Sequence, residues 1–256
     1  KLANGRLKPL YLANSRVADT TNRLRDTNSP LWGRVATDPF YPRFWPERME
    51  ELAKRNALIY KKGFSVKPIG VFVVDMGDLF GIGIPRKWTS DVLDLISDNG
   101  YDRFYLLTHQ PQNLMQFSPF PDNCFVGVTA TTLEEYCAAI VGLAAIEAKV
   151  KYISFEPLLE RIPMMTPYSF AYDDISWVII GACTGTLNEL KPLAMEYPDL
   201  ILKPYGRKWT LQPKVKWVEQ IEGACNKASI AVFEKDNLKP LLDYNVRQEM
   251  PREGQC

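Results

Sequence analysis

Six short apolar runs recur along the chain, and each gives way to polar residues at its C-terminal end. The strands they predict span 69–74, 103–107, 124–129, 151–155, 176–181 and 230–234. The apolar residues are continuous instead of alternating with polar ones, which is typical of strands buried on both faces of a parallel sheet. In such sheets ligands bind at the carboxyl ends of the strands. The pattern therefore predicts a ligand site where these six strands end.

Helical patterns lie between the predicted strands. Helices are expected at 47–62, 85–98, 111–116, 132–148 and 213–227. Regular alternation of strand and helix implies right-handed crossovers and a parallel sheet. Six strands are fewer than the eight of a closed barrel, so both a partial (β/α) barrel and an open doubly wound sheet fit. We predict one α/β domain over 1–256, with an irregular N-terminal arm at 1–45 and a C-terminal extension at 240–256.

Composition is that of a soluble globular protein. The 256 residues are 46% hydrophobic and 24% charged, which is ordinary for this class. No apolar stretch approaches the roughly 20 residues of a membrane helix, and no charged-then-apolar leader opens the chain. We therefore expect a cytoplasmic protein without a membrane partner. Because the first residue is Lys1 and not methionine, we also expect an N-terminal piece to be missing.

Five cysteines are scattered without CxxC spacing: Cys124, Cys137, Cys183, Cys225 and Cys256. An odd number with these spacings argues against a disulfide scaffold. It argues equally against a metal or cluster site built within this chain alone. No metal ligands are assigned to these residues.

Charge is unevenly distributed, although the net charge is only +1. Up to Lys67 there are 14 Lys or Arg against 6 Asp or Glu, while the remainder holds 17 against 24. The basic first part is also rich in aromatic residues. It fits either an arm that meets phosphate or nucleic acid, or a solvated arm that covers the core.

The first two strand ends offer titratable candidates. Asp75 and Asp78 flank Met76 and Gly77, and fit either a pair that holds an amine, hydroxyl or metal or caps of the next turn. His109 is the sole histidine, so any imidazole chemistry must use it. A hydrogen-bonded structural histidine is the alternative.

The last three strand ends offer a second group of candidates. Glu156 can bind a ligand amine or hydroxyl, act as a base, or simply pair with a Lys or Arg. The segment from Gly181 to Gly185 allows close approach of a ligand to the backbone. Cys183 within it fits a reactive thiol or a small buried side chain. Lys235 adds a cation at the last strand end.

Several of these segments, taken in order, resemble those of a known family. They are Val73–Phe80, Leu107–Pro111, Gly127–Thr129, Ser154–Leu159 and Trp177–Gly181. The similar family is encoded in phages, prophages, bacteria and archaea, and itself resembles the radical S-adenosylmethionine (SAM) enzymes. The similarity runs from about Leu2 to Pro251.

The resemblance implies a partial (β/α) barrel with a 4Fe–4S cluster at its open end. Such a cluster binds SAM and cleaves it reductively, and the resulting 5′-deoxyadenosyl radical abstracts a substrate hydrogen. Three cysteines hold three irons and leave the fourth for SAM. In the family these cysteines precede a segment like Leu2–Arg6, so the cluster ligands are expected upstream of Lys1.

The resemblance also implies roles for the strand ends. The segment Asp75–Asp78 would meet the SAM amino group, Thr129 and Glu156 its ribose and carboxylate, and Gly181–Thr184 the adenine or the substrate. Cofactor contacts are thus expected from Asp75, Met76, Gly77, Asp78, Thr108, Thr129, Glu156 and Gly181. Catalytic contributions are expected from His109, Cys183 and Lys235.

Three strand ends depart from the family pattern. The end of the strand at 103–107 has His109-Gln110 where Thr-Lys-Arg-Pro is common. The end of the strand at 124–129 has Thr129-Ala130-Thr131 where a carboxylate often follows, and the end of the strand at 176–181 has Gly181–Gly185 in place of Gly-Gly-Glu-Ser-Gly. Substrate contacts are therefore not carried over. The expected partners are an electron donor for the cluster and an unidentified substrate, for which a nucleic acid, a nucleotide and a peptide all fit.

Two other functions fit the same residues. One is a nucleic-acid- or nucleotide-binding barrel without redox chemistry, which uses the basic arm. The other is a metal-dependent or acid–base barrel enzyme that uses Asp75, Asp78, His109 and Glu156. The radical SAM enzyme is the function that we favour.

Overall fold

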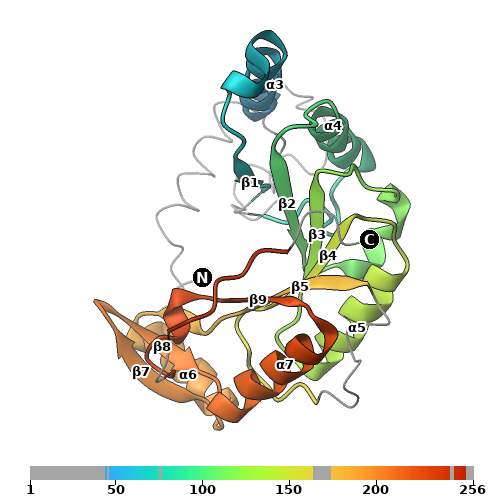
Figure 1. Cartoon of the computed structure of the whole chain (residues 1–256). Helices are drawn as coiled ribbons and strands as arrows, with labels where there is room; N and C mark the ends of the chain where they lie inside the picture. The colour runs from blue at the N-terminus through green and yellow to red at the C-terminus, as the bar shows by residue number, and fades with distance from the viewer. Residues whose placement is uncertain (1–43, 45, 75–76, 164–173, 243–244, 252–256) are drawn as a thin grey trace, which may run out of the picture. The chain divides into compact units, whose positions relative to one another are not determined.

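The computed structural model describes residues 44, 46–74, 77–163, 174–242 and 245–251 (Figure 1). The chain divides into two compact units, 1–51 and 52–256. In the first unit the described residues are Phe44 and 46–51. Residues 46–51 form the start of helix α3 (Pro46–Lys62). The irregular arm predicted at 1–45 lies outside the described residues apart from Phe44.

A six-stranded parallel sheet is the centre of the second unit. Its order is β1-β2-β3-β4-β5-β9, and every neighbouring pair is parallel. The strands are β1 (Gly70–Phe72), β2 (Arg103–Thr108), β3 (Cys124–Thr129), β4 (Val150–Phe155), β5 (Ile175–Ile180) and β9 (Ala231–Glu234). They coincide with the six predicted strands, and the predicted partial barrel is confirmed as a half-barrel of α/β type.

Helices cover the outer face of this sheet (Figure 1). They are α4 (Arg86–Ser97), which connects β1 and β2, α5 (Leu133–Ala144), which connects β3 and β4, and α7 (Val215–Ala228), which precedes β9. Strand residues Phe104, Ile153 and Val232 pack with helix residues Ile96 and Ile221 in one continuous buried core. Of the helices in the described ranges, none has the length and apolar content to cross a membrane.

Aromatic rings fill the inner face of the half-barrel. The ring centroids of Tyr105 and Phe125 lie 5.1 Å apart, those of Tyr152 and Trp177 5.2 Å, and those of Trp177 and Phe233 6.1 Å. Gly127 makes room for this packing, because a Cβ at that position would lie 2.2 Å from the Tyr152 ring. The interior below the strand ends is therefore a closed aromatic floor and not an open channel.

A second, antiparallel sheet follows β5 and was not predicted. Its order is β6-β8-β7, from β6 (Cys183–Gly185), β7 (Ile201–Tyr205) and β8 (Lys208–Gln212), and helix α6 (Leu187–Glu196) contacts all three strands. The sequence predicts no strand or helix at 182–212. The strands are short and β7 contains Pro204, so none of the three shows the continuous apolar run of the main sheet.

Two of the predicted helices differ in the structure. The helix expected at 132–148 ends at Ala144. The Glu147 amide donates to the Ser118 hydroxyl and the Glu147 carbonyl accepts from the Phe120 amide, so this backbone does not continue the helix. The helix expected at 111–116 is replaced by two 3₁₀ turns, η3 (Pro111–Asn113) and η4 (Met115–Phe117). Two further 3₁₀ turns are η2 (Gly63–Ser65) and η6 (Asp236–Leu238).

The C-terminal extension pairs with the open edge of β9. The Glu234 amide donates to the Arg247 carbonyl at 2.6 Å, and the Glu249 amide donates to the Val232 carbonyl at 3.0 Å. The Trp177 indole donates to the Glu249 carbonyl at 2.9 Å. These bonds satisfy backbone groups of an edge strand that would otherwise be left unpaired.

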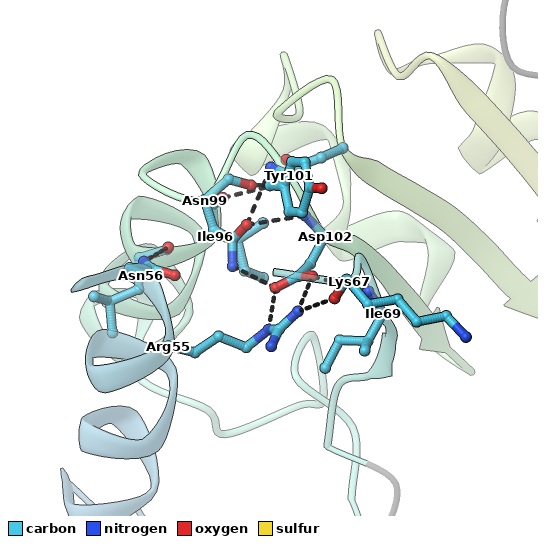
Figure 2. A network of polar contacts seen from close by, with 10 residues as sticks. Arg55, Asn56, Lys67, Ile69, Ile96, Asn99, Tyr101 and Asp102 are labelled. Atoms are coloured by element: carbon cyan, nitrogen blue, oxygen red, sulfur yellow. Dashed lines mark hydrogen bonds and ion pairs between the residues drawn. The ribbon is translucent and has the colours of Figure 1, made fainter. Parts of the chain in front are cut away.

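A buried carboxylate joins the amino ends of β1 and β2 to α3 (Figure 2). The side chain of Asp102 is fully buried, and it accepts hydrogen bonds from the Arg55 guanidinium, from Asn99 at 2.8 Å and from the Ile69 amide at 2.9 Å. Burial alone would raise the pKa of Asp102, but these hydrogen bonds outweigh it and hold the pKa below its ordinary value. The group fixes the end of the sheet opposite to the candidate site.

Candidate functional site

A row of side chains crosses the inner face of the sheet near its carboxyl edge. Thr129, Ser154, Ile179 and Phe233 are aligned by the strand register. Thr129 and Ser154 are buried, while Ile179 and Phe233 are half-buried. The row places two hydroxyl-bearing residues beside two apolar residues immediately below the strand ends.

An ion pair lies above this row, between the ends of β4 and β9. The Lys235 ammonium donates to the Glu156 carboxylate at 2.5 Å. Glu156 lies two positions after Ser154, and Lys235 lies two positions after Phe233, so both side chains continue the inner face. The side chains are 29% exposed for Glu156 and 42% for Lys235, so a ligand can reach both charged groups.

Gly181 makes this pair possible. It directly follows β5, the strand that lies between β4 and β9. A Cβ at Gly181 would lie 3.1 Å from Glu156 Cγ and 3.2 Å from Lys235 Cδ. The ion pair therefore crosses the strand end where a larger side chain would stand, and it occupies the cradle that the missing side chain leaves at the centre of the edge.

Asn237 fixes the backbone that follows Gly181. Its amide oxygen accepts from the Ala182 amide at 3.1 Å, and its amide nitrogen donates to the Ala182 carbonyl at 2.7 Å and to the Thr184 hydroxyl at 3.2 Å. The side chain thus bonds Ala182 as a neighbouring strand would. No role for Asn237 is predicted from the sequence, because nothing in the local pattern indicates one.

A second polar group lies at the ends of β1 and β2. The Asp78 carboxylate accepts from the Thr108 hydroxyl at 2.8 Å, from the His109 amide at 2.9 Å and from the Phe80 amide at 2.9 Å. The last bond is a local turn, which is the capping alternative that the sequence left open. Thr108 is buried and also accepts from the Gln110 amide, so its hydroxyl is engaged within the protein.

The two polar groups stand apart along the carboxyl edge. Thr108 ends β2 and Glu156 follows β4, so one strand separates them and the distance is two strand spacings, about 10 Å. The end of β3, with Thr129, lies between them. An extended ligand with polar groups at both ends can bridge this interval, whereas a direct contact between Asp78 and Glu156 is not part of the arrangement.

The remaining predicted residues are placed differently. His109 is exposed, and its backbone amide donates a hydrogen bond to Asp78. Gly77 is exposed and precedes Asp78, while Asp75 and Met76 lie outside the described residues. Cys183 lies in β6, is half-buried and packs against the main core. It does not belong to the row at the strand ends.

Two buried thiols are held in their protonated form. Burial raises the pKa of Cys124 and of Cys225 to about 12, so both thiols stay protonated at neutral pH. Within the described ranges, no three His, Cys, Asp or Glu side chains gather closely enough to hold a metal ion.

A cavity of about 930 Å³ lies at the opposite, amino edge of β4, β5 and β9. Its lining carries charges of both signs, including Lys149, Asp174, Arg247 and Glu249. Arg247 and Glu249 neutralise one another at 2.9 Å. Parallel sheets bind ligands at the carboxyl edge, and we place the functional site there because the exposed Glu156–Lys235 pair and the Gly181 cradle are both at that edge.

Comparison with known proteins agrees with this architecture. A family model described as "Protein of unknown function (DUF5131)" matches residues 15–201. The chain belongs to the DUF5131 family. No curated protein matches this DUF5131 chain.

Among solved structures, the DUF5131 chain is similar to spore photoproduct lyase complexed with dinucleoside spore photoproduct. The TM-score is 0.51 at 11% identity, over 81% of this chain and 72% of that chain. A mutant of the same enzyme with bound AdoMet and dinucleoside spore photoproduct gives a TM-score of 0.49 at 11% identity, over 78% and 68% of the two chains. The first likeness shows that the DUF5131 chain shares the half-barrel fold of spore photoproduct lyase.

Proposed function

We propose that this DUF5131 chain binds SAM at the carboxyl edge of its half-barrel and acts as a radical SAM enzyme. The single observation that carries the proposal is the Glu156–Lys235 pair over Gly181, on a sheet of radical SAM type. The sequence resemblance supports it, because it independently assigns SAM contacts to these strand ends.

The groups present at the edge match the chemistry of SAM. SAM carries an amino group, a carboxylate, two ribose hydroxyls and an apolar adenine face. Glu156 offers a second carboxylate oxygen as acceptor for an amine or hydroxyl, and Lys235 offers donors for a carboxylate. The absence of a Cβ at Gly181 lets the two side chains meet over the end of β5, where both remain partly exposed. The residues therefore fit SAM in charge and in hydrogen-bonding type.

The aromatic floor supports the same proposal. Tyr152 is fully buried and Trp177 nearly so, and both lie beneath the row at the strand ends. A closed floor excludes water from below and leaves the ligand in contact with the half-buried Ile179 and Phe233. Exclusion of water strengthens charged hydrogen bonds to Glu156 and Lys235 and protects reactive species from side reactions.

The described residues do not supply ligands for a 4Fe–4S cluster. The chemistry that such a cluster provides is the electron that cleaves SAM reductively. No described residue is assigned to it, and the proposed roles of Glu156, Gly181 and Lys235 concern the binding and orientation of SAM alone.

The reaction class is tested on the protein as its gene encodes it, purified without oxygen. We expect iron and acid-labile sulfide, and formation of 5′-deoxyadenosine from SAM under reducing conditions. Glu156→Gln is expected to lower this formation, while Glu219→Gln, an exposed glutamate on α7, serves as the matched control. Absence of both iron–sulfide and 5′-deoxyadenosine would refute the radical SAM assignment.

A further inference from the structure

The antiparallel sheet β6-β8-β7 continues the carboxyl edge outward. Directly paired residues share a face of a sheet, so the register places Thr184, Thr210, Lys203, Tyr205 and Lys208 on one face. The opposite face carries Leu211 and Leu202, which pack in the main core. One face is therefore apolar and covered, and the other is polar.

The polar face joins the candidate site directly. Asn237, which binds Ala182 behind Gly181, also donates to Thr184 on this face. Gln212 on the same face is fully buried and donates to the Asn237 carbonyl at 2.6 Å and to the Thr210 hydroxyl at 2.7 Å. The sheet is thus fixed to the segment that follows Lys235. Thr210 and Gln212 at its centre are fully buried, so the accessible residues of this face are Thr184 and those at the β7–β8 end.

This sheet is basic. Its three strands and the β7–β8 turn contain Lys203, Arg207 and Lys208 and no Asp or Glu. Arg207 and Lys208 form the tip of the β7–β8 hairpin, are exposed, and make no ion pair with another described residue. Lys203 is fixed by the Pro240 carbonyl at 2.8 Å, and the half-buried Tyr205 stands between Lys203 and the tip. The hairpin therefore presents unneutralised positive charge beside an aromatic ring.

We propose that the β7–β8 hairpin binds a single strand of nucleic acid and presents it to the carboxyl-edge site. This inference rests on the proposed function for the identity of that site. Arg207 and Lys208 bind phosphates, and Tyr205 stacks on an unpaired base, the combination that proteins use for single strands. The similar spore photoproduct lyase structure holds a dinucleoside, which shares the bases and sugars of a nucleic acid strand.

Charge complementarity favours this occupant over an acidic peptide. Phosphates repeat at every nucleotide and are the ligands that Arg binds through two parallel hydrogen bonds. An acidic peptide uses the same charges but has no planar base for Tyr205. The two occupants therefore differ in their dependence on Tyr205, and this difference enters the experiment.

The test measures binding of a fluorescein-labelled oligothymidylate of about 20 nucleotides, longer than the roughly 4–16 that a small domain covers, by fluorescence anisotropy over a series of salt concentrations. The variant is Arg207→Gln/Lys208→Gln. The matched control is Lys61→Gln/Lys62→Gln, which removes the same charge from exposed positions at the end of α3. SAM binding is measured on the same three proteins.

The hairpin variant is expected to bind about 25-fold more weakly at 0.1 M salt, because each single-strand phosphate contact contributes a salt slope of about 0.7 and two are lost. The slope falls by about 1.4, and the control keeps the parent slope. Tyr205→Leu weakens binding about fivefold or more without changing the slope, as expected for lost stacking.

Three results overturn the inference. One is an equal loss of affinity in the hairpin variant and the control. Another is competition by duplex DNA or polyglutamate as strong as by oligothymidylate. The third is no binding of oligothymidylate at low salt by a chain that binds SAM. Intact oligothymidylate binding with no SAM binding would instead refute the proposed function and leave the hairpin assignment supported.

Discussion

At the scale of single residues, the carboxyl edge depends on the absence of a side chain at Gly181. The Glu156–Lys235 pair spans the end of β5 because no Cβ occupies that position. Both charged groups are partly exposed, so the pair itself contributes little to stability, about 0–1 kcal/mol. Its value lies in holding two opposite charges together at the edge, where both stay partly exposed.

Gly181→Ala tests this geometry without removing a charged group. The added Cβ would lie 3.1 and 3.2 Å from flexible side-chain carbons, so we expect the pair to be displaced and SAM binding to weaken about tenfold or more, the effect of one lost charged hydrogen bond. Calorimetric titration with SAM measures this. Urea unfolding should change by less than about 1 kcal/mol, and a large loss of stability would contradict the account.

Residue roles were predictable only in part. The sequence placed Glu156, Gly181 and Lys235 at strand ends, because a buried strand that breaks into polar residues marks its own carboxyl end. It did not indicate that Thr108 is engaged by Asp78, or that Asn237 binds the backbone of Ala182. Those partners come from distant positions, and single-residue patterns carry no information on them.

At the scale of elements, Asp102 holds α3, β1 and β2 together (Figure 2). Its fully buried carboxylate faces Arg55, whose side chain is 21% exposed. Breaking a buried pair from one side leaves an uncompensated charge. The stability of the first two strands therefore depends on one carboxylate.

Asp102→Asn is expected to lower the free energy of unfolding by about 3 kcal/mol. Asp91→Asn removes the exposed partner of Lys87 on α4 and should cost no more than about 0.5 kcal/mol. Urea unfolding of both variants measures the difference. The double variant Asp102→Asn/Arg55→Met should be less destabilised than the sum of its single changes; simple additivity would show that the pair does not act as a unit.

The same group gives a pH dependence. The pKa of Asp102 is held below its ordinary value of 3.8, and that of Glu249, where hydrogen bonds from the Val232 amide and Arg247 outweigh burial, below 4.5. Near these values the unfolded chain binds more protons than the folded one, so stability rises with pH. The contribution is present above the unfolded pKa values and is lost as pH falls through the folded ones.

We therefore expect the urea midpoint to fall steeply as the pH drops from 5 to 3, and to change little from 7 to 5. Asp102→Asn should flatten the acidic part of this curve. A parallel curve for the variant would show that other carboxylates determine acid unfolding.

The predictability of elements followed the strength of their patterns. The six strands of the main sheet were found because their apolar runs are continuous, although β1 at the sheet edge is largely exposed and not buried on both faces. Strands β6, β7 and β8 were missed because they are short and half-polar. Two signals were present: the Gly206-Arg207 turn between Tyr205 and Lys208 fits a two-residue hairpin, and Thr186 with Glu189 forms a capping box at the start of α6.

At the scale of the whole molecule, the fold explains where the site lies. All six strands of the half-barrel run parallel, so their carboxyl ends meet at one edge, and the aromatic floor closes the interior beneath it. The parallel direction of these strands was predictable from the alternation with helices. The antiparallel sheet, which extends this edge with basic residues, was not.

The central claim is that the carboxyl edge binds SAM, and calorimetric titration of the chain with SAM tests it most directly. We predict saturable binding of one SAM per chain, weakened about 10-fold or more in Glu156→Gln and unchanged in Glu219→Gln. No saturable binding at millimolar SAM, or equal affinity in all three proteins, would contradict the claim.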